Sequence, residues 1–99
     1  MKVIAKKRGW GKTTALVEMM LENDDLLFVA PTSKQAEVGY KYAARVNPDI
    51  DRNRFKKVGS WLENNDKPFV IDEFAGVPFE ILSDLTVAVS FTKRKLEWK

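Results

Sequence analysis

A short polar segment near the N-terminus has the residue types of a phosphate-binding loop. It reads Arg8-Gly9-Trp10-Gly11-Lys12-Thr13-Thr14 and lies between an apolar run and a stretch of good helix formers. Glycines let backbone amides form an anion-binding nest, and the N-terminus of a following helix adds donors. In such a loop the lysine reaches the β- and γ-phosphates and the next hydroxyl binds Mg²⁺. The sequence therefore predicts phosphate contacts from residues 9–14, a catalytic role for Lys12 and a metal-binding role for Thr13.

One position departs from the full phosphate-loop pattern G-x-x-x-x-G-K-[ST], which has glycine where this chain has Lys6. The alternative interpretation is a glycine-rich turn that opens a helix and binds nothing. However, strand-like residues before the loop and helix formers after it are the context in which this motif binds phosphate. We therefore expect a nucleotide, or at least a phosphate, at the loop.

Two adjacent acids follow an apolar run in the second half of the chain. Phe69-Val70-Ile71 has the composition of a buried strand, and Asp72-Glu73 closes it. At the carboxyl end of a parallel strand, Asp72 would hold Mg²⁺ through water and Glu73 would orient and deprotonate an attacking water. An acidic turn after a strand is also common without any such role. Beside a phosphate loop, the pair predicts Mg²⁺-dependent hydrolysis of ATP with Glu73 as the catalytic base.

The composition of the chain removes several other chemistries. It contains neither cysteine nor histidine, which excludes disulfide scaffolds, thiol catalysis, imidazole metal sites and histidine-based triads. Its 17 basic and 14 acidic residues give a net charge of +3, which is too small a bias to establish nucleic-acid binding. No apolar run approaches the roughly 20 residues that span a bilayer, and the N-terminus lacks the apolar stretch of a signal peptide. We expect a cytoplasmic protein without membrane contacts.

Apolar runs alternate with helix-like stretches along the chain. Strands are expected at 3–5, 26–30, 55–58, 69–71 and 86–91, helices at 13–22, 33–46 and 78–84, and a helical turn at 60–63. Strands that alternate with helices indicate an α/β fold with a parallel sheet, whose strand ends share the edge where ligands bind. The 99 residues allow one domain, 1–99. We expect a minimal three-layer, P-loop NTPase-like sheet with flanking helices.

Four features occur in a fixed order along the chain. Arg8 stands three residues before Gly11-Lys12-Thr13, Pro31-Thr32 precedes Gln35-Ala36, a small residue and Pro78 follow the acids, and Ser90-Phe91-Thr92 forms a hydroxyl-rich strand end. Together they resemble the ATPase core of the large terminase subunit, the phage DNA-packaging motor, and helicase-like P-loop ATPases more broadly. The resemblance implies ATP and Mg²⁺ as ligands, a Walker B role for Asp72, contact of a catalytic Arg8 with the γ-phosphate, and work in DNA packaging or processing. For Arg8, a solvated base beside Lys6 and Lys7 is the alternative that stays open.

The resemblance spans most of the chain, but the chain is much smaller than a terminase. The segment after Glu73 is short and carries only Glu80, Asp84 and Glu97 as acids, so no nuclease is expected. Turnover would then need a homo-oligomer or a partner that supplies an arginine and closes the site. The strand order stays open. A helicase-like sheet has another strand between the loop strand and the acid strand, whereas a kinase-like sheet has these two adjacent.

Four side chains near the expected site each allow a functional and a structural interpretation. Gln35 would sense nucleotide or couple its helix to the site, but a capping box with Thr32 is favoured. Ser90 and Thr92 would sense the γ-phosphate, but ordinary strand hydroxyls are favoured. Trp10, at the loop tip, would stack on a base or on a partner, or would pack against the loop.

Two further groups of residues are assigned mainly to structure. The basic segment 52–57 includes Phe55, and bases interleaved with an aromatic suit single-stranded nucleic acid, but a solvated surface is favoured. Met19, Met20, Tyr40 and Tyr42 are expected in or near the core, and Val46 is expected on the apolar face of its helix.

The sequence is compatible with two functions from different classes. The first is a Mg²⁺-dependent ATPase. The alternative is a non-catalytic module that binds nucleotide, protein or nucleic acid on a reduced P-loop fold. A small-molecule kinase would also use a phosphate loop, but it needs a lid and an acceptor site that this sequence does not offer.

Overall fold

The computed structural model describes residues 1–6, 11–73 and 82–92. Its strands are β1 (Lys2–Lys6), β2 (Leu27–Ala30), β3 (Phe55–Lys57), β4 (Phe69–Ile71) and β5 (Thr86–Thr92), its helices are α1 (Lys12–Glu22) and α2 (Ser33–Val46), and its 3-10 helices are η1 (Arg52–Arg54) and η2 (Ser60–Asn64). The α/β class is confirmed. The prediction of a helix at 78–84 is wrong for residues 82–84, because residues 82–85 form a loop and turn before β5. The first part of that predicted helix lies outside the described residues.

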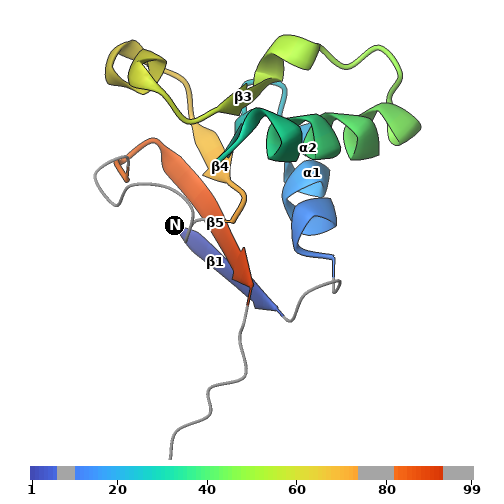
Figure 1. Cartoon of the computed structure of the whole chain (residues 1–99), viewed down its shortest axis with the longest axis horizontal. Coiled ribbons are helices and arrows are strands. Elements are labelled where there is room, and N and C mark those ends of the chain that lie inside the picture. The colour runs from blue at the N-terminus through green and yellow to red at the C-terminus, as the bar shows by residue number, and fades with distance from the viewer. Residues whose placement is uncertain (7–10, 74–81, 93–99) are drawn as a thin grey trace, which may run out of the picture.

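All five strands are parallel and lie in the order β1-β5-β4-β2-β3. A strand therefore separates β1, which precedes the glycine-rich segment, from β4, which precedes the two acids (Figure 1). This is the first of the two orders that the sequence leaves open. Because the strands are parallel, their carboxyl ends share one edge, and α1 and α2 both begin there.

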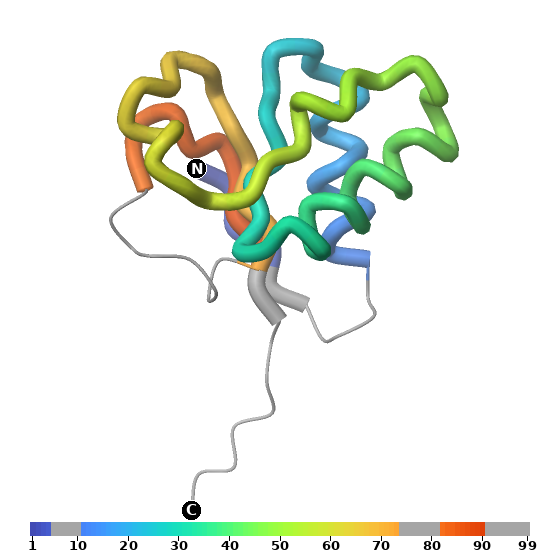
Figure 2. The backbone as a smooth tube through the Cα atoms, turned by 45° about the horizontal axis from the view of Figure 1, so that its top comes forward, coloured from blue at the N-terminus to red at the C-terminus, as the bar shows by residue number. Residues whose placement is uncertain are grey.

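The larger part of the core lies on one face of the sheet, under α1 and α2. Phe28 on β2 is fully buried there, and the two helices lie on the same side of the strands (Figure 2). A side chain at Gly39 of α2 would bring its Cβ to 2.6 Å from the Phe28 ring, so glycine allows this close approach. Buried residues on this face come from both helices and all five strands of the sheet: Ile4, Leu16, Val17, Met20, Phe28, Ala30, Ala36, Ala43, Phe55, Val70 and Ala88.

The other face of the sheet carries a smaller apolar cluster. It contains Leu27, Val29, Phe69, Ile71 and Val89, and it is covered by Val58, Trp61 and Leu62 around η2 and by Leu82 and Leu85. Within the described ranges, no α-helix packs on this face. The expectation of helices flanking both faces is therefore not met there, and the 3-10 helix η2 takes that position.

The buried stripe of α2 is narrower than the sequence suggests. It consists of Ala36, Gly39 and Ala43, and Tyr40 packs against its edge. Val46, the last residue of α2, is 72% exposed, so it does not belong to a buried face, and Tyr42 is 39% exposed, so its expected place in or near the core is wrong. The stripe ends one turn before the helix does. Met20 is fully buried and Met19 is partly buried, as expected.

The solvated surface favoured for the basic segment 52–57 holds for Arg52 and Lys57, which are exposed, but not for Arg54 and Phe55. Arg54 donates hydrogen bonds to the carbonyl oxygens of Met20, Asn23 and Leu26 at 2.8, 2.7 and 3.1 Å. Arg52 pairs with Glu37 and lies 4.2 Å from the centre of the Tyr40 ring; the hydrogen bond that Arg52 donates to the Glu37 carboxylate raises the pKa of Arg52. Phe55 is buried. Only part of this stretch is therefore available to a ligand.

Replacing Arg54 by methionine is expected to destabilise the fold by about 2 kcal/mol, because the substitution leaves carbonyl groups at the end of α1 without their charged donor. Urea denaturation followed by circular dichroism measures the effect. The matched control is Arg52→Met, which makes the same substitution at an arginine in an exposed ion pair. It should destabilise the fold less than Arg54→Met does. Equal losses from both variants would contradict the role given to Arg54.

Candidate functional site

The first turn of α1 is built to receive a negative charge. Gly11 precedes the helix with φ 81°, a left-handed conformation that favours glycine. No side chain caps this turn and no acidic residue lies in it. Lys12 is nevertheless buried there, with 7% of its surface exposed. A cation at the positive end of the helix dipole is unfavourable alone, so this turn requires an anion nearby.

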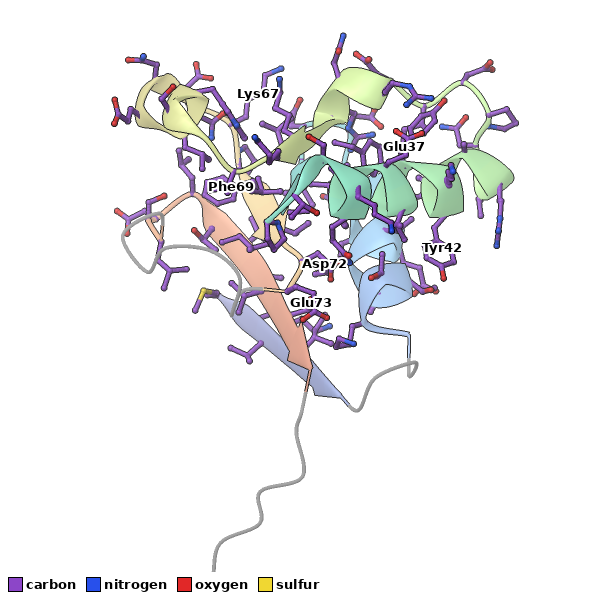
Figure 3. All side chains as sticks on the ribbon, viewed as in Figure 1. Glu37, Tyr42, Lys67, Phe69, Asp72 and Glu73 are labelled. Carbon is purple, nitrogen blue, oxygen red and sulfur yellow. The ribbon has the colours of Figure 1, made fainter. Side chains whose placement is uncertain are left out.

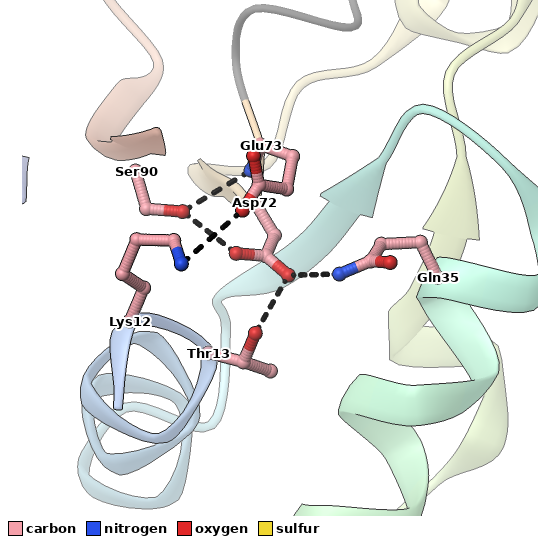
Figure 4. Close-up of polar contacts among 6 residues, drawn as sticks. All are labelled: Lys12, Thr13, Gln35, Asp72, Glu73 and Ser90. Carbon is pink, nitrogen blue, oxygen red and sulfur yellow. Dashed lines mark hydrogen bonds and ion pairs between the residues drawn. The ribbon is translucent and has the colours of Figure 1, made fainter. Parts of the chain in front are cut away.

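The carboxylate of Asp72 lies next to this turn and is fully buried. Its Oδ2 accepts hydrogen bonds from Thr13 Oγ1 on α1 and Gln35 Nε2 on α2, each at 2.9 Å. Its Oδ1 accepts one at 2.6 Å from Ser90 Oγ on β5 (Figure 4). Burying a carboxylate costs several kcal/mol, and these donors offset part of that cost. All three are neutral, and among the described residues no cation forms a salt bridge with Asp72.

Glu73 provides the negative charge that faces Lys12. The Lys12 Nζ lies 3.4 Å from the Glu73 carboxylate, which is partly exposed. The backbone of Glu73 has φ 53°. This conformation costs a non-glycine residue about 1–3 kcal/mol and often occurs at functional sites. The backbone N–H of Glu73 donates to Ser90 Oγ at 3.1 Å. The Ser90 hydroxyl therefore contacts both residues, the carboxylate of Asp72 and the backbone of Glu73. Figure 3 shows Asp72 and Glu73 side by side near the start of α1.

Four residues expected from the sequence come together here: Lys12, Thr13, Asp72 and Glu73. Thr14 lies in the same helical turn and is exposed. Arg8, Gly9, Trp10 and the side chain of Thr92 lie outside the described residues. The site therefore joins the start of α1 to the end of β4. Ile71 of β4 pairs with Val89 of β5, so Asp72 and Ser90, the next residues, are also neighbours.

Two residues of the site were assigned to other roles from the sequence. Thr32 caps α2, as expected, by accepting the N–H of Gln35 at 3.1 Å. The Gln35 side chain, however, reaches Asp72, so the favoured capping box is wrong for that side chain. Ser90 is fully buried between the two acids and is not an ordinary strand hydroxyl.

The residues present fit a magnesium ion that is shared with a phosphate ligand. Mg²⁺ usually takes one or two protein oxygens and completes its shell with water and substrate phosphates. The Thr13 hydroxyl and the Asp72 carboxylate, 2.9 Å apart, are such a pair, and the buried carboxylate lacks a cation among the described residues. Within the same residues no group of three or more acidic, cysteine or histidine side chains forms a metal cage. The site therefore suits an ion that arrives with phosphates.

Comparisons with known proteins leave the function to be argued from geometry. No family model matches the chain, and searches of curated proteins and of solved structures return no significant match. In the described part of the chain, no helix has the length and apolar character to cross a membrane.

Proposed function

We propose that this protein binds ATP with Mg²⁺ and hydrolyses it, as a small P-loop ATPase resembling the terminase ATPase core. One observation carries the proposal: the uncapped start of α1, with Lys12 and Thr13, lies against the two acids that end β4. The contacts are 2.9 Å between Thr13 and Asp72 and 3.4 Å between Lys12 and Glu73. The strand inserted between β1 and β4 supports the helicase-like version of this fold.

In the proposed complex, phosphate takes the position of the anion that Lys12 now finds in Glu73. The amides of residues 12–14 and the Lys12 ammonium bind the β- and γ-phosphates, and Gly9, Trp10 and Gly11 complete the loop. Thr13 and Asp72 hold the magnesium ion, which neutralises phosphate charge when bound. Lys12 therefore exchanges a carboxylate partner for a phosphate partner, and Glu73 is released.

Glu73 then acts on water. Its carboxylate accepts a proton while the water oxygen forms a bond to the γ-phosphorus, and the bond from that phosphorus to the bridging oxygen of ADP breaks. Ser90 keeps Glu73 in place through its backbone N–H. Lys12 stabilises charge on the transferred group, and Arg8 is proposed to contact the same phosphate.

The wider role is proposed from the resemblance. A terminase-like core works on DNA in the cytoplasm, in a phage-infected host for a phage protein, and an oligomer or protein partner supplies a further arginine and closes the site. The Lys12–Glu73 ion pair also favours a second candidate, a module that binds nucleotide without hydrolysis, because that pair occupies the proposed base.

Phosphate release tests the ATPase proposal. ATP and GTP are each incubated with the protein in excess Mg²⁺ or in chelator, and free phosphate is measured over time. Release that requires Mg²⁺ is the expected result. Binding without release would support the non-catalytic module, and neither binding nor release would contradict both functions.

A further inference from the structure

Helix α2 contributes one side chain to the metal side of the site. We propose that Gln35 is a positioning residue for the Asp72 carboxylate and couples the first turn of α2 to magnesium-dependent nucleotide binding. The inference rests on the proposed function, since it concerns how Asp72 is prepared for its ion. Gln35 is part-buried in its contact with Asp72 and donates from Nε2 at 2.9 Å.

The three donors to Asp72 come from three different elements. Thr13 belongs to α1 and Ser90 to β5. Both elements border the place where the phosphates are proposed to bind. Gln35 shares Oδ2 with Thr13 but approaches from α2 (Figure 4). The three donors together fix both oxygens of a carboxylate that has no access to water. Without Gln35, Oδ2 loses one of the two hydrogen bonds that fix its position.

The residue type suits this role. An amide donates to a carboxylate without adding a charge, whereas a glutamate at the same position would place a second anion against a buried one. The backbone is also fixed, because Thr32 caps the turn and Ala36 is buried beneath it. A defined helix start therefore delivers the Gln35 amide to Asp72.

The same helical turn also borders a cleft. Ser33 and Glu37 line a cleft of about 280 Å³ between α2 and β3, together with Lys56 and Lys57. Gln35, which donates to Asp72, therefore lies in the sequence between two residues that line this cleft. A movement of that turn changes the contact with Asp72, and a change at Asp72 is transmitted to the turn.

The test measures how ATP affinity depends on Mg²⁺ in Gln35→Met. Methionine keeps the length and volume of the side chain and removes the donor. We expect the Mg²⁺ concentration that gives half of the affinity gain to rise about 10- to 100-fold, the usual cost of losing a partner of a metal-binding carboxylate. ATP affinity in chelator should change by less than about 2-fold, because Gln35 does not touch the phosphate side. Lys34→Met, an exposed neighbour in the same turn, is the matched control and should match the wild type.

A second measurement tests whether nucleotide binding is coupled to the first turn of α2. Hydrogen exchange of the α2 amides is measured with and without Mg·ATP. In the wild type, ligand should change exchange in the first turn of α2, and in Gln35→Met this change should be lost while α1 still responds. If methionine prevents folding, Gln35→Asn keeps an amide that is too short to reach Asp72 and should give the same shift.

The outcomes separate this inference from the function on which it rests. A wild-type protein that binds no nucleotide overturns both. Normal Mg²⁺ dependence in Gln35→Met, with normal wild-type binding, overturns the positioning role alone. Equal weakening of ATP binding with and without Mg²⁺ would assign Gln35 a purely structural role and would also overturn the proposal.

Discussion

Replacing Lys12 by alanine is expected to weaken Mg·ATP binding at least about 100-fold, equivalent to about 2.7 kcal/mol. Lys12 is buried at the start of α1 and already has a carboxylate at 3.4 Å. Charge-assisted contacts in such a dry position are stronger than those at a surface. The loss should therefore be much larger than that caused by removing an exposed charge. Calorimetric titration of both proteins with Mg·ATP measures it.

Two further variants distinguish the position of this charge from the charge itself. Lys12→Met preserves the buried stem of the side chain and should lose binding as alanine does. Lys41→Ala removes one positive charge from an exposed position on α2 and should leave binding near the wild-type value. Similar losses from Lys12→Ala and Lys41→Ala would mean that net charge alone attracts the nucleotide.

The second large effect is expected at Glu73. Glu73→Gln should lower the rate of ATP hydrolysis about 10²- to 10⁴-fold, the usual contribution of a general base. Glutamine keeps the size of the side chain and the backbone N–H that Ser90 accepts, but it does not take a proton at neutral pH. Mg·ATP affinity should stay within a few-fold of wild type, because the base acts on water. Single-turnover hydrolysis with enzyme in excess measures the rate without product release.

Glu63→Gln provides the control for Glu73→Gln, since it makes the same change at an exposed position in η2. It should hydrolyse ATP at the wild-type rate. If Glu73→Gln also keeps the wild-type rate while Lys12→Ala loses binding, the nucleotide site is real but Glu73 is not the base. Another group would then activate the water, and the role given to Glu73 would be wrong.

Local sequence signals predict most of the elements because those elements are defined by neighbouring residues. Helix α2 has the predicted bounds, 33–46, since Thr32 caps it and Asn47-Pro48 ends it. β4 is also predicted to the residue, because a short apolar run ends at two acids. The meeting of Lys12 and Thr13 with Asp72 and Glu73 follows from the rule that parallel strand ends share one edge.

The rest depends on contacts between distant parts of the chain. Ser90 reaches Asp72 only because β5 lies beside β4, and a strand order is not encoded in the composition of either strand. Gln35 has the spacing of a capping box, and local geometry alone does not reveal that its side chain crosses to Asp72. Val46 fits the helical period of α2, but the core ends before it does.

Calorimetry of the wild-type protein with ATP, with Mg²⁺ present and with Mg²⁺ chelated, tests the central claim most directly. The claim is that the start of α1 and the acids after β4 form one magnesium–nucleotide site. We predict saturable binding of one ATP per chain that tightens when Mg²⁺ is present. Absence of binding at any concentration reached, or binding that is indifferent to Mg²⁺, would contradict it.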